Sequence, residues 1–231
     1  MSQSESASCN LKNLIILSLC QALFFSGRTL TFFAAALVAI AMLGENLIFA
    51  TAPVTAMLVG TSVATLPASF LMRAWGRRLG FAIGSVIGFS GALIAAQAVA
   101  MDNFGIFNLG IFLSGLYGGF AQQYRFAAAE VAPAHLKEKN VSIVIAMSVL
   151  GAFVGPETAL MAKDWIAGAA FQGTFYVLAG FYALSAIIIQ FVQIPKLTED
   201  EIKDSGRPLR EIMKSPTFII AVIAALFGYV V

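Results

Sequence analysis

Long apolar stretches alternate with short charged turns along this chain, and the alternation predicts membrane-spanning helices. The stretches that contain no Asp, Glu, Lys or Arg are residues 47–72, 79–101, 103–124 and 165–195. Each is longer than the about 20 apolar residues that a helix needs to cross a bilayer. The sequence therefore predicts an all-α integral membrane protein.

Two further spans contain isolated charges. Residues 11–43 are interrupted only by Lys12 and Arg28, and the apolar residues 140–156 continue past a single acid, Glu157. These give six predicted spans in all. The predicted organisation is a cytoplasmic tail over residues 1–10, a six-helix bundle over 11–195, a cytoplasmic linker over 196–214 and a truncated seventh transmembrane helix over 215–231.

Composition agrees with this pattern. Charged residues make up 11% of the chain, against about 25% in a soluble domain. A soluble protein of 231 residues could not bury the 59% of its residues that are hydrophobic in one core. No secretory signal is predicted, because the first ten residues are polar and the first apolar run is too long.

The basic residues outside the spans predict the orientation. If the N-terminus is cytoplasmic, only Lys163 faces the outside. The residues that then face the cytoplasm are Lys12, Arg73, Arg77, Arg78, Lys137, Lys139, Lys196, Lys203, Arg207, Arg210 and Lys214. Positive residues gather on the cytoplasmic side of membrane proteins, so a multi-pass protein with a cytoplasmic N-terminus is expected.

Charged side chains within spans are the first candidates for function. Arg28 lies about halfway along the first span and cannot deprotonate, so it needs an anionic ligand, a carboxylate or water. Substrate contact and a structural ion pair are both open for Arg28. Glu157 follows Pro156 and either carries a coupling proton, pairs with Arg28, or reaches outside water.

Three more polar side chains are candidates for lining a substrate cavity. Gln21 lies in the first span, and Gln122 and Arg125 are three residues apart on the fourth, where they would share a helix face. For Arg125, a structural or gating role is the main alternative. Glu130 is expected to find its partner in a cytoplasmic loop.

The sequence contains no pattern of an enzyme. It has no nucleophile–base pair, no phosphate-binding loop and no metal-ligand cluster, and Cys9 and Cys20 match no redox or metal spacing. No enzyme, cofactor or nucleic-acid partner is predicted. The expected partners are the lipid bilayer and a small-molecule or metal-ion substrate.

Glycines at helical spacing predict close packing between spans. Gly80, Gly84 and Gly88 share one face of the third predicted helix, and Gly115 and Gly119 share a face of the fourth. Small residues let helix backbones approach each other closely within a membrane.

Several motifs resemble those of the major facilitator superfamily. Residues 69–78, Ser-Phe-Leu-Met-Arg-Ala-Trp-Gly-Arg-Arg, are similar to its loop motif Gly-x-Leu-x-Asp-Arg-x-Gly-Arg-Arg. Gly151, Gly155 and Pro156 resemble its Gly-x-x-x-Gly-Pro motif, and the segment 196–214 resembles the link between its two six-helix halves. The resemblance implies an N-terminal half built as a three-plus-three inverted repeat, followed by the start of helix seven.

The resemblance also implies conformational roles, with one departure. The gating residues that it implies are Arg73, Gly76, Arg77, Arg78, Gly151, Gly155 and Pro156. Arg73 stands at the acidic position of the loop motif, so a latch there needs another acid or is absent. Topology anchoring is the alternative role for Arg77 and Arg78.

A narrower resemblance bears on the substrate. Residues 67–72, 122–130 and 207–212 are similar to segments of a bacterial subgroup that includes copper importers for cytochrome oxidase assembly and riboflavin importers. Methionine thioethers suit copper(I), and Met57, Met147 and Met161 lie in spans, but no methionine pair at i and i+4 does. The metal-binding residues, if any, therefore remain unknown.

These observations favour a secondary transporter that alternates access between two halves. Its candidate solutes are copper, riboflavin and other small organic compounds. The second half would come from the same chain, a second chain or a homodimer. A transporter-like membrane assembly factor without transport is the alternative from another class. The resemblance implies the bacterial inner membrane.

Overall fold

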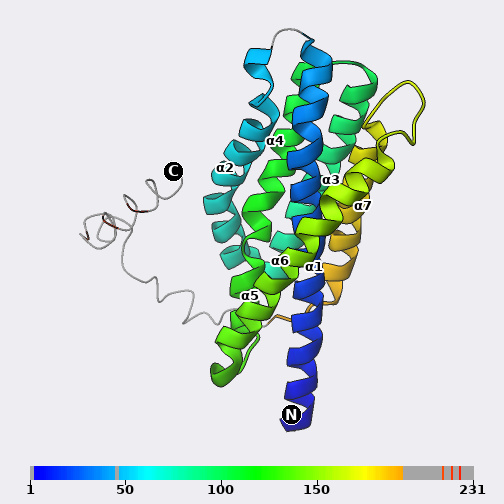
Figure 1. Ribbon diagram of the computed structural model, residues 1–231. Helices are drawn as coiled ribbons and strands as arrows, with labels where there is room; N and C mark the ends of the chain where they lie inside the picture. The colour runs from blue at the N-terminus through cyan, green and yellow to red at the C-terminus, as the bar shows by residue number, and fades with distance from the viewer. Residues whose placement is uncertain (1–2, 45–46, 195–214, 216–219, 221–223, 225–231) are drawn as a thin grey trace. The chain divides into compact units, whose positions relative to one another are not determined.

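The computed structural model describes residues 3–44 and 47–194 and the single residues 215, 220 and 224. Regular structure in these residues is entirely helical (Figure 1). The elements are α1 (Gln3–Leu43), η1 (Leu47–Phe49), α2 (Ala52–Trp75), α3 (Arg77–Ala100), α4 (Phe104–Ala121), α5 (Tyr124–Glu130), η2 (Ala134–Leu136), α6 (Lys137–Ala162), α7 (Gln172–Ile188) and η3 (Ile189–Phe191). The predicted linker, 196–214, and nearly all of the predicted seventh helix, 215–231, lie outside the described residues.

Among the described residues, 6 helical segments are long and apolar enough to cross a membrane, which confirms the predicted number of complete spans. Two of them are interrupted. Helices α4 and α5 together form the span Phe104–Glu130, and α7 continues through η3 to complete Gln172–Phe191.

The structure differs from the sequence prediction at two boundaries. Helix α1 begins at Gln3, so the polar tail continues the helix beyond its apolar part, which starts at Asn10. The sixth span begins at Gln172 rather than near residue 165. A loop precedes it, closed by a hydrogen bond of 2.8 Å from the Phe171 amide to the Lys163 carbonyl, and Phe171 has a φ of 68°. Hydrophobicity alone could not reveal this loop, because its residues are mostly apolar.

Helix pairing follows the symmetry of an inverted repeat. In such a repeat, α1 corresponds to α4 and α2 corresponds to α6, so the pairs α2–α4 and α1–α6 are equivalent. Both pairs are in extensive contact, and α3 packs against α4 and α7. Figure 1 shows α6 crossing α1 and α2 running beside α4.

The predicted glycine faces are used for this packing. A Cβ atom on Gly84 would lie 2.6 Å from the Phe120 Cβ, and one on Gly88 would lie 2.9 Å from the Tyr117 Cβ. Gly119 leaves similarly little room beside Ala64 on α2. These glycines bring α3 and α2 against α4, as the prediction of close packing requires.

Candidate functional site

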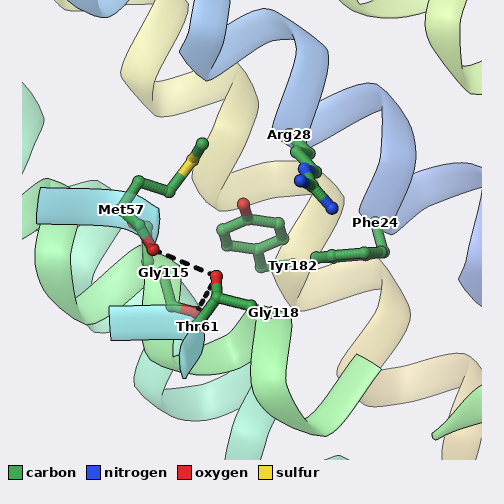
Figure 2. A pocket seen from close by; sticks show the side chains of 8 residues that line it. Phe24, Arg28, Met57, Thr61, Gly115, Gly118 and Tyr182 are labelled. Atoms are coloured by element: carbon green, nitrogen blue, oxygen red, sulfur yellow. Dashed lines mark hydrogen bonds between the residues drawn. The ribbon is translucent and has the colours of Figure 1, made fainter. Parts of the chain in front are cut away.

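A pocket with an empty volume of about 210 Å³ lies between α1, α2, α4 and α7 (Figure 2). The residues that line it are Phe24, Arg28, Met57, Thr61, Ser114, Gly115, Gly118 and Tyr182. That volume includes space open to solvent, so the enclosed part of the pocket is small.

Arg28 supplies the charge in this pocket. Its guanidinium carbon lies 5.9 Å from the centroid of the Phe25 ring and 5.7 Å from that of Phe32, one turn of α1 to either side. Such distances permit cation–π attraction. Within the described residues, no carboxylate or hydrogen-bond acceptor pairs with the Arg28 guanidinium. The structural ion pair considered for Arg28 is therefore not formed within this part of the chain.

Ser114 places a second polar group at the pocket. Its side chain is 3% exposed, and its hydroxyl has no hydrogen-bond partner among the residues that the structure describes. A buried polar group without a partner is costly and is uncommon in native structures. Thr61 differs, because its hydroxyl lies 3.0 Å from the carbonyl oxygens of both Met57 and Gly115 and is thus satisfied.

Aromatic rings form the rest of the wall. Tyr117 packs edge-on against Phe24 and Tyr182, with ring centroids 5.4 Å and 4.8 Å away. The Tyr117 hydroxyl lies 2.9 Å from the hydroxyl of Tyr124 and 2.8 Å from that of Ser185. This buried network links α4, α5 and α7 beside the pocket, and it fixes the aromatic wall behind Phe24 and Tyr182.

Two glycines allow α2 to reach the pocket. A Cβ atom on Gly115 would overlap the carbonyl oxygen of Met57, and one on Gly118 would lie 2.6 Å from the Thr61 Oγ1. Figure 2 shows Thr61 bridging Met57 and Gly115 at this contact. The pocket wall therefore depends on the absence of side chains at these two positions of α4.

Comparison with known proteins decides the family. The sequence profile of the Major Facilitator Superfamily matches residues 17–231. The chain belongs to this superfamily. The predicted family is thus confirmed, and its members are generally transporters rather than enzymes.

Two curated relatives in the superfamily match the chain. The riboflavin transporter RfnT of Brucella anthropi is 34% identical over 220 residues, which are 94% of this chain and 55% of that protein. The uncharacterized MFS-type transporter YdeG of Bacillus subtilis is 25% identical over 181 residues, 77% of this chain and 42% of that protein. The chain therefore spans about half the length of these relatives.

Solved structures show the same fold. The inward-open xylose transporter XylE from E. coli superposes with a TM-score of 0.70 at 18% identity, covering 95% of this chain and 56% of that one. The E. coli fucose:proton symporter FucP superposes with a TM-score of 0.63 at 15% identity, covering 92% of this chain and 55% of that one. The chain is thus an integral membrane protein with the six-helix fold of one half of a major facilitator transporter, as predicted.

The predicted cavity residues other than Arg28 do not line the pocket. Gln21 donates a hydrogen bond of 2.8 Å to the Ser148 hydroxyl and so links α1 to α6. Gln122 caps the end of α4, whereas Arg125 is exposed on α5 with its guanidinium 5.0 Å from the centroid of the Phe126 ring. Because the helix breaks between Gln122 and Arg125, the shared face expected of them is interrupted. Their roles in binding stay predictions.

Glu157 is exposed on α6, and among the described residues it forms no ion pair. The pairing with Arg28 considered from the sequence is therefore not formed. A proton-coupling role for Glu157 stays a prediction.

Arg77 of the superfamily loop motif forms an ion pair. The Arg77 guanidinium donates two hydrogen bonds to the carboxylate of Glu130 at the end of α5. Glu130 thus finds its partner beside the predicted cytoplasmic loop, as expected, and supplies an acid that the motif lacks at Arg73. Arg78 donates to the Gln190 side chain over 3.3 Å.

The glycines of the second motif pack against α1. A Cβ atom on Gly151 would lie 2.7 Å from the Ala22 carbonyl oxygen, and one on Gly155 would lie 2.5 Å from that of Ser26. Pro156 follows within the same helix, α6. Close contact between α1 and α6 is therefore the observed role of Gly151 and Gly155, and gating stays a prediction for both motifs.

Sequence reasoning missed the uncharged pocket residues. Phe24, Thr61, Ser114 and Tyr182 are of residue types that are common in membrane helices, so nothing marks them in one dimension. The one available signal is Arg28, since a charge within a membrane span requires polar neighbours.

Proposed function

We propose that this chain forms one half of a secondary transporter for riboflavin or a related flavin, and that the Arg28 pocket is its part of the substrate site. The observation that carries the proposal is a half-buried arginine in a pocket that also contains the buried Ser114 hydroxyl, neither of which has an acid or hydrogen-bond partner among the described residues. The 34% identity to a riboflavin transporter favours flavin as the solute.

The chemistry of the pocket suits a flat aromatic ring with polar edges. Phe24 and Tyr182 offer ring faces, and Arg28 offers several donors in a fixed plane. Copper is less well supported, since Met57 is the one sulfur-bearing residue of the lining. The described residues also contain no group of three or more His, Cys, Asp or Glu side chains able to hold a metal ion.

The remaining features of the proposal complete the transporter. A second six-helix half provides the other side of the site, and rocking of the halves alternates access. The protein lies in a bacterial inner membrane with its N-terminus in the cytoplasm. Glu157 carries the coupling proton.

Uptake of labelled riboflavin tests the function. We expect a riboflavin-auxotrophic bacterium that expresses the native gene to take up riboflavin faster than cells with an empty vector. Arg28→Met should lower the rate at least about tenfold, because hydrogen bonds to a charged group contribute about 1.5–3 kcal/mol. Lys12→Gln, which removes an exposed charge from the same helix, should keep the wild-type rate.

Membrane abundance of each variant is measured by immunoblot, so that lost uptake is separated from lost insertion. Copper-64 uptake without flavin uptake would replace the proposal by the copper alternative. If neither solute enters but deletion of the gene lowers the amount of a membrane complex, the assembly-factor alternative holds. Glu157→Gln should abolish the dependence of uptake on external pH if it carries the proton.

A further inference from the structure

The polar groups of the pocket have a particular chemical character. Arg28 offers only donors, and the hydroxyls of Ser114, Thr61 and Tyr182 can each donate or accept. No carboxylate or carboxamide side chain is present in the lining. The described part of the site therefore offers more donors than acceptors, which suits a ligand group that is rich in acceptors.

A flavin has two chemically different ends. Its sugar-alcohol chain carries hydroxyls, each of which is both donor and acceptor, and protein sites for such chains need side-chain acceptors. Its pyrimidinedione edge carries two carbonyl oxygens on either side of one N–H. Arg28 can donate to a carbonyl oxygen, and Ser114 can accept from the N–H.

The residues around Arg28 also favour the pyrimidinedione end of the flavin. The walls beside Arg28 are the rings of Phe24 and Tyr182 and the thioether of Met57, which suit the face of a flat ring rather than a flexible polyol. Arg28 is also held between Phe25 and Phe32, which limits the positions that its guanidinium can take.

We infer that Arg28 and Ser114 bind the pyrimidinedione edge of the flavin ring, so that the sugar-alcohol chain points away from this half of the protein. The inference rests on the proposed function, since it requires that a flavin is the ligand. It assigns specificity for the ring to this half of the protein.

The test measures flavin binding to the purified product of the native gene by quenching of flavin fluorescence. The ligands are riboflavin, 3-methylriboflavin, in which the N–H is blocked, and lumichrome, which lacks the sugar-alcohol chain. We expect the wild-type protein to bind lumichrome and to discriminate against the 3-methyl compound. Arg28→Met should weaken the binding of riboflavin and that of lumichrome by the same factor, at least about tenfold.

Ser114→Ala should remove most of the discrimination between riboflavin and its 3-methyl derivative while changing lumichrome affinity by about two- to tenfold. The matched control is Ser90→Ala, an exposed serine on α3 whose hydroxyl bonds within its own helix. It should leave all affinities unchanged. Arg28→Lys should restore part of the affinity, because it keeps the charge but loses the planar donor pair.

The outcomes separate the inference from the function. If riboflavin binds but Arg28→Met leaves lumichrome affinity unchanged, Arg28 does not contact the ring and the inference is wrong. A different result would assign Arg28 to a phosphate group instead. In that case flavin mononucleotide would bind the wild-type protein more tightly than riboflavin does, and Arg28→Met would remove this difference in affinity. If no flavin binds the wild-type protein, both the inference and the proposed function fail.

Discussion

At the pocket, single atoms decide how closely the helices approach each other. Gly115 and Gly118 place the bare backbone of α4 against Met57 and Thr61 of α2. The Thr61 hydroxyl can then reach the Gly115 carbonyl across the contact while bonding within its own helix. Thr61 thus acts as a polar link between two apolar helices, whereas the hydroxyl of Ser114, just before Gly115, has no partner in the described part of the chain.

Substitution of Gly115 tests this contact. In Gly115→Ala the new methyl group would meet the backbone of Met57, which cannot rotate away as a side chain can. We expect a loss of about 1–3 kcal/mol of stability, typical of overpacking, measured as a lower Tm of the purified protein and weaker flavin binding.

The control is Gly180→Ala on α7, where a Cβ atom meets nothing within 4 Å. Alanine is the better helix former, so the Tm of this variant should be unchanged or higher. Equal Tm values for the two variants would contradict the tight contact between α2 and α4.

At the scale of elements, the turn between α2 and α3 consists of one residue. Gly76 has a φ of 92°, a conformation that other residues rarely adopt, and this permits the abrupt reversal between the two helices. Arg77 then begins α3 and pairs with Glu130 at the end of α5. The pair therefore connects the loop motif to the fourth span.

The Arg77–Glu130 pair should matter more for transport than for stability. Both side chains are partly exposed, at 20% and 39%, and such pairs contribute about 0–1 kcal/mol. We expect Glu130→Gln to change the Tm little but to lower the uptake rate, if the pair holds one state of the transport cycle. The double variant Arg77→Glu with Glu130→Arg should recover part of that rate.

Glu138→Gln is the matched control, since Glu138 is an exposed acid at the start of α6. Uptake that falls equally in Glu130→Gln and Glu138→Gln would show a general effect of charge rather than a latch. Failure of the charge-swapped pair to recover any activity would also count against it.

At the scale of the whole molecule, the bundle leaves two helices with little cover. Among the membrane spans, those of α2 and α6 are the least buried, and they are equivalent in the inverted repeat. Large apolar side chains such as Phe70 and Phe153 are exposed on them. Lipid or the proposed second half would cover these surfaces.

The orientation of the bundle can be measured directly. In a background with Cys9→Ser and Cys20→Ser, we expect Asp164→Cys to react with a membrane-impermeant maleimide in intact cells. Lys12→Cys should react only after the membrane is made permeable, because basic residues remain on the cytoplasmic side. Both positions are exposed in the structure. The reverse pattern of labelling would contradict the predicted cytoplasmic N-terminus.

The sequence by itself determined the class, the number of complete spans and the family. A helix that crosses a bilayer must be long and apolar over its whole length, and such a segment can be recognised directly in the sequence. Arg28 could be selected for the same reason, since a charge within a span is conspicuous. The loop before α7 could not be predicted, because its residues are mostly apolar. The break between α4 and α5 could not be predicted either, because Gln122 and Gln123 are residues that helices readily contain.

Only the tertiary structure decided which polar residues meet. Gln21, Gln122 and Arg125 were candidates beside Arg28, yet Arg28 is the one of them that lines the pocket. Its neighbours Ser114 and Tyr182 come from distant parts of the chain and carry no charge to reveal them. Their convergence depends on close contacts at Gly115 and Gly118, and thus on distances between backbones that a linear pattern does not contain.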